Sequence, residues 1–148
     1  MPHAGLMSQE QLDSPEGLLV RARLHIRGAR RRLRQAKIAA GIVTLADALS
    51  AAMEWYVSAP ERRTGLTILP GDNLQEDRGL YPVLVRSRVL DGTFDFEAFD
   101  RLTEEALDRE MPGFDYQKLE ADLERVMAQL GVMPFDEALL PPEDPRTY

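Results

Sequence analysis

The chain has 148 residues, 44% of them hydrophobic, and a formal net charge of −7. This length and composition support one sizeable core without disulfide or metal staples. The absence of cysteine excludes thiol catalysis, disulfides and cysteine-bound metals. We expect a disordered N-terminal tail over residues 1–13, a single helical domain over 14–140 and a flexible C-terminal tail over 141–148.

The sequence predicts a cytoplasmic protein. Its first residues show neither the basic leader nor the apolar stretch of a secretory signal. No uninterrupted apolar run approaches the roughly 18 residues of a membrane span, so no membrane partner is expected.

The charge is divided between two halves of the chain. Residues 17–46 contain eight basic residues and no acidic one. Residues 91–148 contain 16 carboxylates against five basic residues, a net of −11. We expect the two halves to attract each other, or to attract the opposite half of a second copy.

The first predicted helix runs from position 15 to about position 40. Ser14 suits an N-cap, Pro15 suits the first helical position, and an apolar stripe follows at helical spacing. Gly41 is then expected as the C-cap glycine, and Thr44 as the start of a second helix over 45–58. The two helices should form a close antiparallel hairpin.

The middle of the chain combines an irregular stretch with a short apolar segment. Residues 60–79 are punctuated by proline and glycine and should form a loop. We expect this loop to cover the core through Leu66, Ile68 and Leu69. Residues 82–90 fit a short helix, with one arm of a β-hairpin as the alternative.

The dipeptide Phe-Asp occurs three times, at Phe94-Asp95, Phe114-Asp115 and Phe135-Asp136. Each aspartate suits an N-cap, and each phenylalanine can pack against the apolar residue five positions later as a hydrophobic staple. The pattern predicts helices over 96–109 and 116–130, and at most a helical stub after the third dipeptide. Two full units are fewer than the three that a solenoid needs, so the repeats are interpreted as helix starts.

The first predicted helix carries a basic face. At 100° per residue its members project from one side of the helix; they are Arg23, Arg27, Arg30, Arg31, Arg34 and Lys37. Guanidinium groups grip phosphate oxygens, so nucleic acid is one candidate ligand. The acidic half of the chain would repel nucleic acid, and pairing of the basic face with acidic helices is the preferred interpretation.

The predicted hairpin resembles the HEPN class of small helical domains, some of which are RNases with the motif R-x(4–6)-H on one helix. This resemblance implies contact with nucleic acid. The motif itself is absent, because Arg21 and Arg23 lie too close to His25. We interpret His25 as a structural or surface residue.

Two further groups provide weaker candidates. Asp100, Glu104 and Asp108 fall on one helical face and could hold a divalent cation, although a solvated face is the simpler interpretation. Trp55 and Tyr56 either belong to the core or form a patch that docks a partner. No cofactor motif is present, and none is expected to bind.

We therefore predict an all-α fold, with a long N-terminal helical hairpin packed against two further amphipathic helices in a bundle-like domain of four to five helices. The predicted function is a cytoplasmic interaction module without catalytic activity. It should self-associate as a homodimer, with its basic first helix paired to acidic helices. The alternatives are a nucleic-acid-associated protein that contacts phosphates through the basic face, and a carboxylate- or metal-dependent hydrolase.

Overall fold

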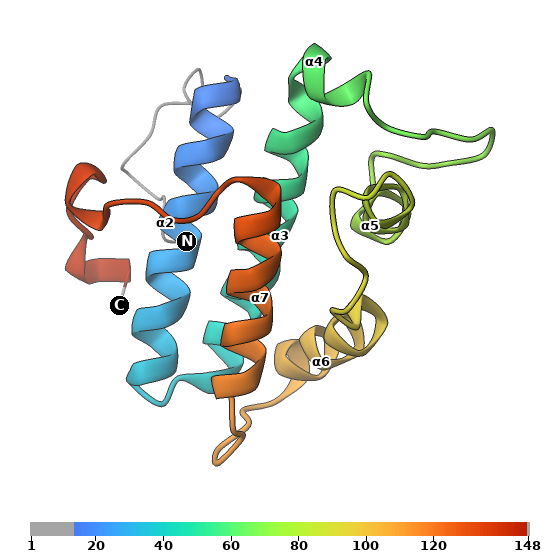
Figure 1. Ribbon diagram of the computed structural model, residues 1–148. Helices are drawn as coiled ribbons and strands as arrows, with labels where there is room; N and C mark the ends of the chain where they lie inside the picture. The colour runs from blue at the N-terminus through green and yellow to red at the C-terminus, as the bar shows by residue number, and fades with distance from the viewer. Residues whose placement is uncertain (1–13, 148) are drawn as a thin grey trace.

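The structure is a computed structural model that describes residues 14–147. In this range the regular structure is entirely helical, without strands (Figure 1), which confirms the predicted all-α fold. The helices are α2 (Pro15–Arg34), α3 (Ile38–Ser58), α4 (Pro60–Arg63), α5 (Asp77–Arg86), α6 (Phe96–Asp108) and α7 (Gln117–Leu130). Two 3-10 turns follow, η1 (Glu137–Leu139) and η2 (Pro145–Thr147). The predicted N-terminal tail lies outside the described residues.

Helix α3 is the central element of the fold. It packs against α2 and also contacts α5, α6 and α7. In Figure 1, α2, α3 and α7 stand side by side, while α5 and α6 lie to the right of them. By length and composition α3 could cross a membrane, but 61% of its most apolar stretch is buried inside the domain. A central helix that packs on several neighbours needs this apolar composition.

The turn between α2 and α3 differs from the prediction. Helix α2 ends at Arg34, and α3 already begins at Ile38. Ala36, at φ 62°, takes the left-handed position that closes a Schellman motif. In this motif the backbone N–H of Lys37 donates to the carbonyl of Arg32 at 2.9 Å. Because glycine is the usual residue at this position, alanine gave no sequence signal for the helix end.

Gly41 and Thr44 lie inside α3, so their predicted roles as C-cap and N-cap are wrong. A Cβ on Gly41 would lie 2.6 Å from Cδ2 of Leu33, and glycine therefore allows the two helices to approach closely beside the turn. The Thr44 hydroxyl donates to the carbonyl of Ala40 at 2.7 Å and accepts from the Arg32 side chain. Gly41 thus allows close packing of the two helices, and Thr44 fixes the position of the Arg32 side chain by a hydrogen bond.

The segment between α4 and α5 only partly covers the core. Leu66 packs against the core, but Ile68 and Leu69 are 43% and 49% exposed, so the predicted cover is wrong for these two. The segment extends away from the helices in Figure 1. Helix α5 covers this part of the core instead. It starts earlier in the chain than predicted and buries Leu80 and Leu84.

The start of α6 has the predicted cap and staple. Asp95 accepts a hydrogen bond from the backbone N–H of Ala98 at 3.0 Å. The rings of Phe94 and Phe99 lie 5.5 Å apart, so the residues before and after the cap pack together. This staple fixes the angle at which the chain enters α6.

The other two Phe-Asp dipeptides give different results. Asp136 caps the turn η1 by accepting from the N–H of Ala138, as predicted. Asp115 accepts from the N–H of Gln117, and Tyr116 occupies the N-cap position of α7. The predicted cap at Asp115 is therefore wrong by one residue.

Candidate functional site

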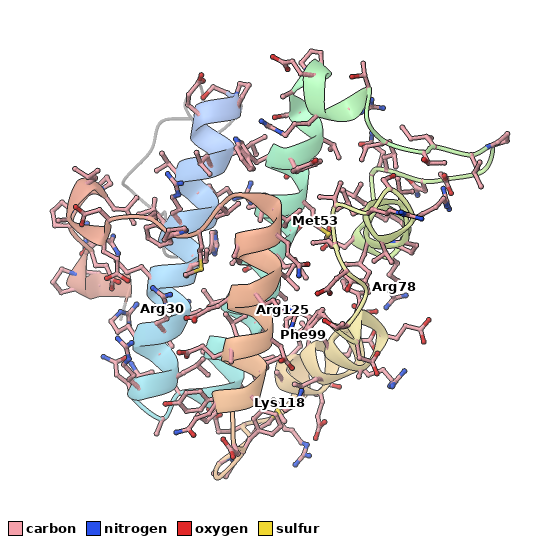
Figure 2. All side chains as sticks on the ribbon, viewed as in Figure 1. Arg30, Met53, Arg78, Phe99, Lys118 and Arg125 are labelled. Carbon is pink, nitrogen blue, oxygen red and sulfur yellow. The ribbon has the colours of Figure 1, made fainter. Side chains whose placement is uncertain are left out.

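Two surfaces of the domain gather charged side chains, and they lie on opposite sides of it. Figure 2 labels Arg30 on α2 and Arg78 on α5, with α7 between them in this view. The first surface is the predicted basic face of α2. The second is a groove between α5 and α6 that no sequence pattern indicated.

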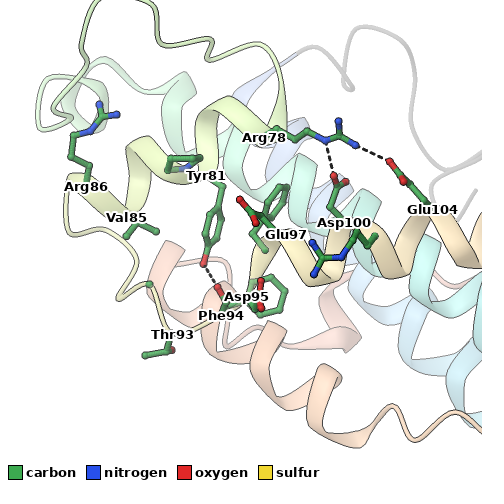
Figure 3. Close-up of a pocket in the computed structure, with 14 residues that line it drawn as sticks. Arg78, Tyr81, Val85, Arg86, Thr93, Phe94, Asp95, Glu97, Asp100 and Glu104 are labelled. Carbon is green, nitrogen blue, oxygen red and sulfur yellow. Dashed lines mark hydrogen bonds and ion pairs between the residues drawn. The ribbon is translucent and has the colours of Figure 1, made fainter.

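The α5–α6 groove is a hollow of about 1060 Å³ bounded by α5, the loop before α6 and the first turns of α6. Tyr81, Phe94 and Phe96 form its aromatic floor. The rings of Tyr81 and Phe96 stack at 4.9 Å, and Tyr81 meets Phe94 edge to face at 6.2 Å. The Tyr81 hydroxyl donates to the carbonyl of Phe94 at 2.9 Å (Figure 3). These contacts hold the rings in place, so the apolar floor is preformed.

The hydroxyl of Tyr81 has a structural role. Burial raises the pKa of Tyr81, and the nearby carboxylates of Asp91 and Asp95 raise it further. The phenol therefore keeps its proton at neutral pH and continues to donate its hydrogen bond. A group in this state does not act as a general base near neutrality.

Ion pairs line the rim of the groove. Arg78 bridges Asp100 at 2.6 Å and Glu104 at 2.8 Å (Figure 3). At the other end of α5, Arg86 pairs with Asp72 at 2.8 Å. The exposed pairs of Arg78 contribute at most about 1 kcal/mol each, so Arg78 can exchange these partners for those of a bound protein.

A short loop beside the groove, residues 66–72, presents Ile68 and Leu69 to solvent; we refer to it as the apolar loop. Arg86 donates to the carbonyl of Thr67 at 2.9 Å and so ties the loop to the end of α5. The backbone N–H of Leu69 donates to the Asp72 carboxylate at 2.6 Å. Because these bonds fix the loop, its apolar side chains can bind without a large ordering cost.

The basic face of α2 is covered by the C-terminal segment of the same chain. Arg27 and Arg31 share the carboxylate of Glu143, at 3.2 Å and 2.5 Å. Both arginine side chains are less than one-sixth exposed, at 12% and 15%. These two predicted site residues therefore already hold an acidic partner.

Arg30 is held by two carboxylates. It pairs with Glu124 of α7 at 2.8 Å and with Glu137 of η1 at 3.0 Å. Burial alone would lower the pKa of Arg30, but hydrogen bonds and charge from the two glutamates outweigh burial and raise it. The guanidinium thus stays charged and links α2 to both acidic segments.

The remaining members of the basic face are placed differently. Arg23 donates to the carbonyl of Val132 at 3.0 Å, and its guanidinium lies 5.4 Å from the ring centre of Phe135. Arg34 and Lys37 are exposed and form no ion pair within residues 14–147. The C-terminal segment therefore covers four of the six predicted residues and leaves these two open.

The predicted aromatic pair, Trp55 and Tyr56, is partly buried and packs against the core. The guanidinium of Arg62 lies 4.1 Å from the ring centre of Trp55 and 5.5 Å from that of Tyr56. Arg62 also donates to the carbonyls of both residues. Much of the aromatic surface is thus shielded by the chain itself.

Two of the three acidic candidates take part in ion pairs, and the third, Asp108, is exposed on α6. Asp100 and Glu104 are held by Arg78, and His25 is fully buried on α2. Among the residues that the structure describes, no group of three histidine or carboxylate side chains converges as a metal site would require. This arrangement provides no concentrated set of ligands for a hard cation.

The groove could not be predicted from the sequence, because two separate segments of the chain form its floor. The only local signal is the concentration of aromatic residues at Tyr81, Phe94 and Phe96, and their meeting depends on how α5 packs on α3. No protein-family model, curated protein or solved structure matches the chain significantly. Functional inference therefore rests on the geometry of the two surfaces.

Proposed function

We propose that the protein is a helical interaction module that forms a homodimer through its α5–α6 face. In this dimer the apolar loop of each copy lies in the groove of the other. The observation that supports the proposal is that Arg86, which lines the groove with the aromatic floor, also ties the apolar loop to the end of α5. In a dimer with two-fold symmetry, the loop of each copy contacts the groove of the other, so the same contact forms twice.

The chemistry of the two surfaces fits this arrangement. Burying a leucine or isoleucine side chain stabilises a contact by about 1.5–3 kcal/mol, and Ile68 and Leu69 are both substantially exposed in one copy. Around the floor, Glu97 and Arg101 are exposed and form no ion pair in the described part of the chain. They provide opposite charges for a polar rim around an apolar centre, which is the usual organisation of an interface.

The alternative functions receive less support from the geometry. Nucleic-acid binding through α2 would need Arg27, Arg30 and Arg31, and carboxylates already neutralise all three. A metal-dependent hydrolase would need convergent ligands, which residues 14–147 do not bring together. Interaction without catalysis is therefore the function that we propose.

Replacement of Leu69 by aspartate tests this proposal. The new charge would lie on the aromatic floor, so Leu69→Asp should weaken dimerisation by at least about 30-fold, the effect of losing an interface hot spot of about 2 kcal/mol. Sedimentation equilibrium over a concentration series measures the dissociation constant of the dimer.

Leu139→Asp is the matched control, because Leu139 is 84% exposed and lies on η1, away from the groove. This variant should dimerise like the wild type. A wild-type protein that remains monomeric over the whole series would overturn the proposal, as would equal effects of the two substitutions.

A further inference from the structure

The C-terminal strap, residues 133–147, crosses the basic face of α2 (Figure 1). No residue from Met133 to Arg146 is buried, and Leu139 is 84% exposed. The strap carries four carboxylates against one arginine. Met133 and Phe135 pack partly against the core, and ion pairs of Glu137 and Glu143 join the rest of the strap to α2.

The basic face grips the carboxylates of the strap as it would grip those of a ligand. Both oxygens of Glu143 are used, because Arg27 approaches Oε1 at 3.2 Å and Arg31 approaches Oε2 at 2.5 Å. Glu137 is held by Arg30 at 3.0 Å. The basic face thus pairs with two strap carboxylates six positions apart, which indicates that it recognises acidic side chains.

The strap does not use the whole basic face. Arg34 lies at the C-terminal end of α2, and Lys37 follows in the turn before α3; both are exposed and form no ion pair within the described part of the chain. A ligand with additional carboxylates can reach these two cations as well as the three partly buried arginines, Arg27, Arg30 and Arg31. Such a ligand has contacts that the strap does not make.

We propose that the basic face of α2 is a binding site for an acidic segment of a partner protein, and that the strap occupies this site until the segment displaces it. As a tethered ligand the strap competes at an effective concentration in the millimolar range. The partner overcomes this competition through the extra carboxylates that pair with Arg34 and Lys37. The site lies on the side opposite to the groove and does not depend on the proposed homodimer.

The full-length double variant Glu137→Gln/Glu143→Gln tests the competition directly. Loss of two strap carboxylates should expose the basic face, so the variant should bind poly-L-glutamate at least about tenfold more tightly than the wild type, because the open form is more populated. Fluorescence anisotropy of a labelled polymer measures this affinity. The matched control is Glu54→Gln/Glu61→Gln, which makes the same change in net charge at two exposed residues on α3 and α4, outside the groove.

A second variant, Arg34→Gln/Lys37→Gln, tests the proposed extra contacts. It should weaken binding of poly-L-glutamate while leaving binding of a synthetic peptide with the sequence of residues 133–148 unchanged. Both residues are exposed, so folding should be preserved, and circular dichroism checks this.

Two results would overturn the proposal. In the first, the Glu137→Gln/Glu143→Gln variant binds poly-L-glutamate no better than the control variant does. In the second, it binds a single-stranded RNA of matched charge more tightly than it binds the acidic polypeptide. The second result would assign the basic face to nucleic acid, whose affinity falls steeply with added salt.

Discussion

Within residues 14–147, three helices are followed by a residue in the left-handed conformation: Ala36, Arg88 and Gly131, at φ 62°, 61° and 89°. Glycine adopts this conformation freely, whereas a residue with a side chain is destabilised by about 1–2 kcal/mol. Of these three helix ends only that of α7, at Leu130, lies where the sequence predicted it; the other two were not located, because alanine and arginine are not typical of this position.

Ala36→Gly should stabilise the protein by about 0.5–1 kcal/mol, because it removes the strain while the Schellman hydrogen bonds remain. Chemical denaturation measures the free energy of unfolding. Ala121→Gly, at an exposed position inside α7, is the control and should destabilise by a similar amount. A loss of stability in both variants would contradict the assigned role of Ala36.

Gly41→Ala should destabilise the protein by about 1–3 kcal/mol, because its Cβ would lie 2.6 Å from Cδ2 of the buried Leu33. The free energy of unfolding, measured by urea denaturation, checks the size of the effect. The loss should shrink when Gly41→Ala is made in a Leu33→Ala background, since the clash is then absent. Additive effects would show that the close approach of the helices does not explain the glycine.

At the scale of elements, the features that could be predicted are those whose residues lie close together in the sequence. The start of α6 was predicted because Asp95, Phe94 and Phe99 lie within six positions of each other. The position of the apolar loop could not be predicted, because it depends on the contact of Arg86 with Asp72 and Thr67. The basic face was predicted from the sequence. Its contact with Glu143 could not be predicted, because this contact depends on the path of the strap.

Asp77→Asn should stabilise the protein at neutral pH. Burial raises the pKa of Asp77, and a hydrogen bond from Ser50 only partly offsets this. A carboxyl group with a raised pKa in the folded state binds its proton more tightly there, so its charged form lowers stability above that pKa. Asparagine removes the charge and keeps an oxygen that accepts from Ser50.

The gain from Asp77→Asn should shrink as the pH falls through the folded-state pKa towards the unfolded-state value of about 3.9. Denaturation curves at neutral pH and near pH 4 measure this difference, with Asp108→Asn, at an exposed site on α6, as the control. A difference between wild type and Asp77→Asn that did not change with pH would contradict the burial of a charge at this position.

At the scale of the whole molecule, the two oppositely charged halves meet within one chain. Ion pairs join α2 to Glu124, Glu137 and Glu143, so charge segregation can be explained without a second copy. The α5–α6 face lies on the other side of the molecule and has its own apolar loop and groove. We propose that this face, and not the basic helix, mediates self-association.

Cross-linking between copies tests this claim most directly, and the chain contains no cysteine that would complicate it. One protein carries Leu69→Cys on the apolar loop, and the other carries Arg101→Cys on the rim of the groove. After the two are mixed and oxidised, mass spectrometry measures the covalent heterodimer. We predict a higher yield than for Leu139→Cys mixed with Arg101→Cys; equal yields in the two mixtures would contradict the proposed homodimer.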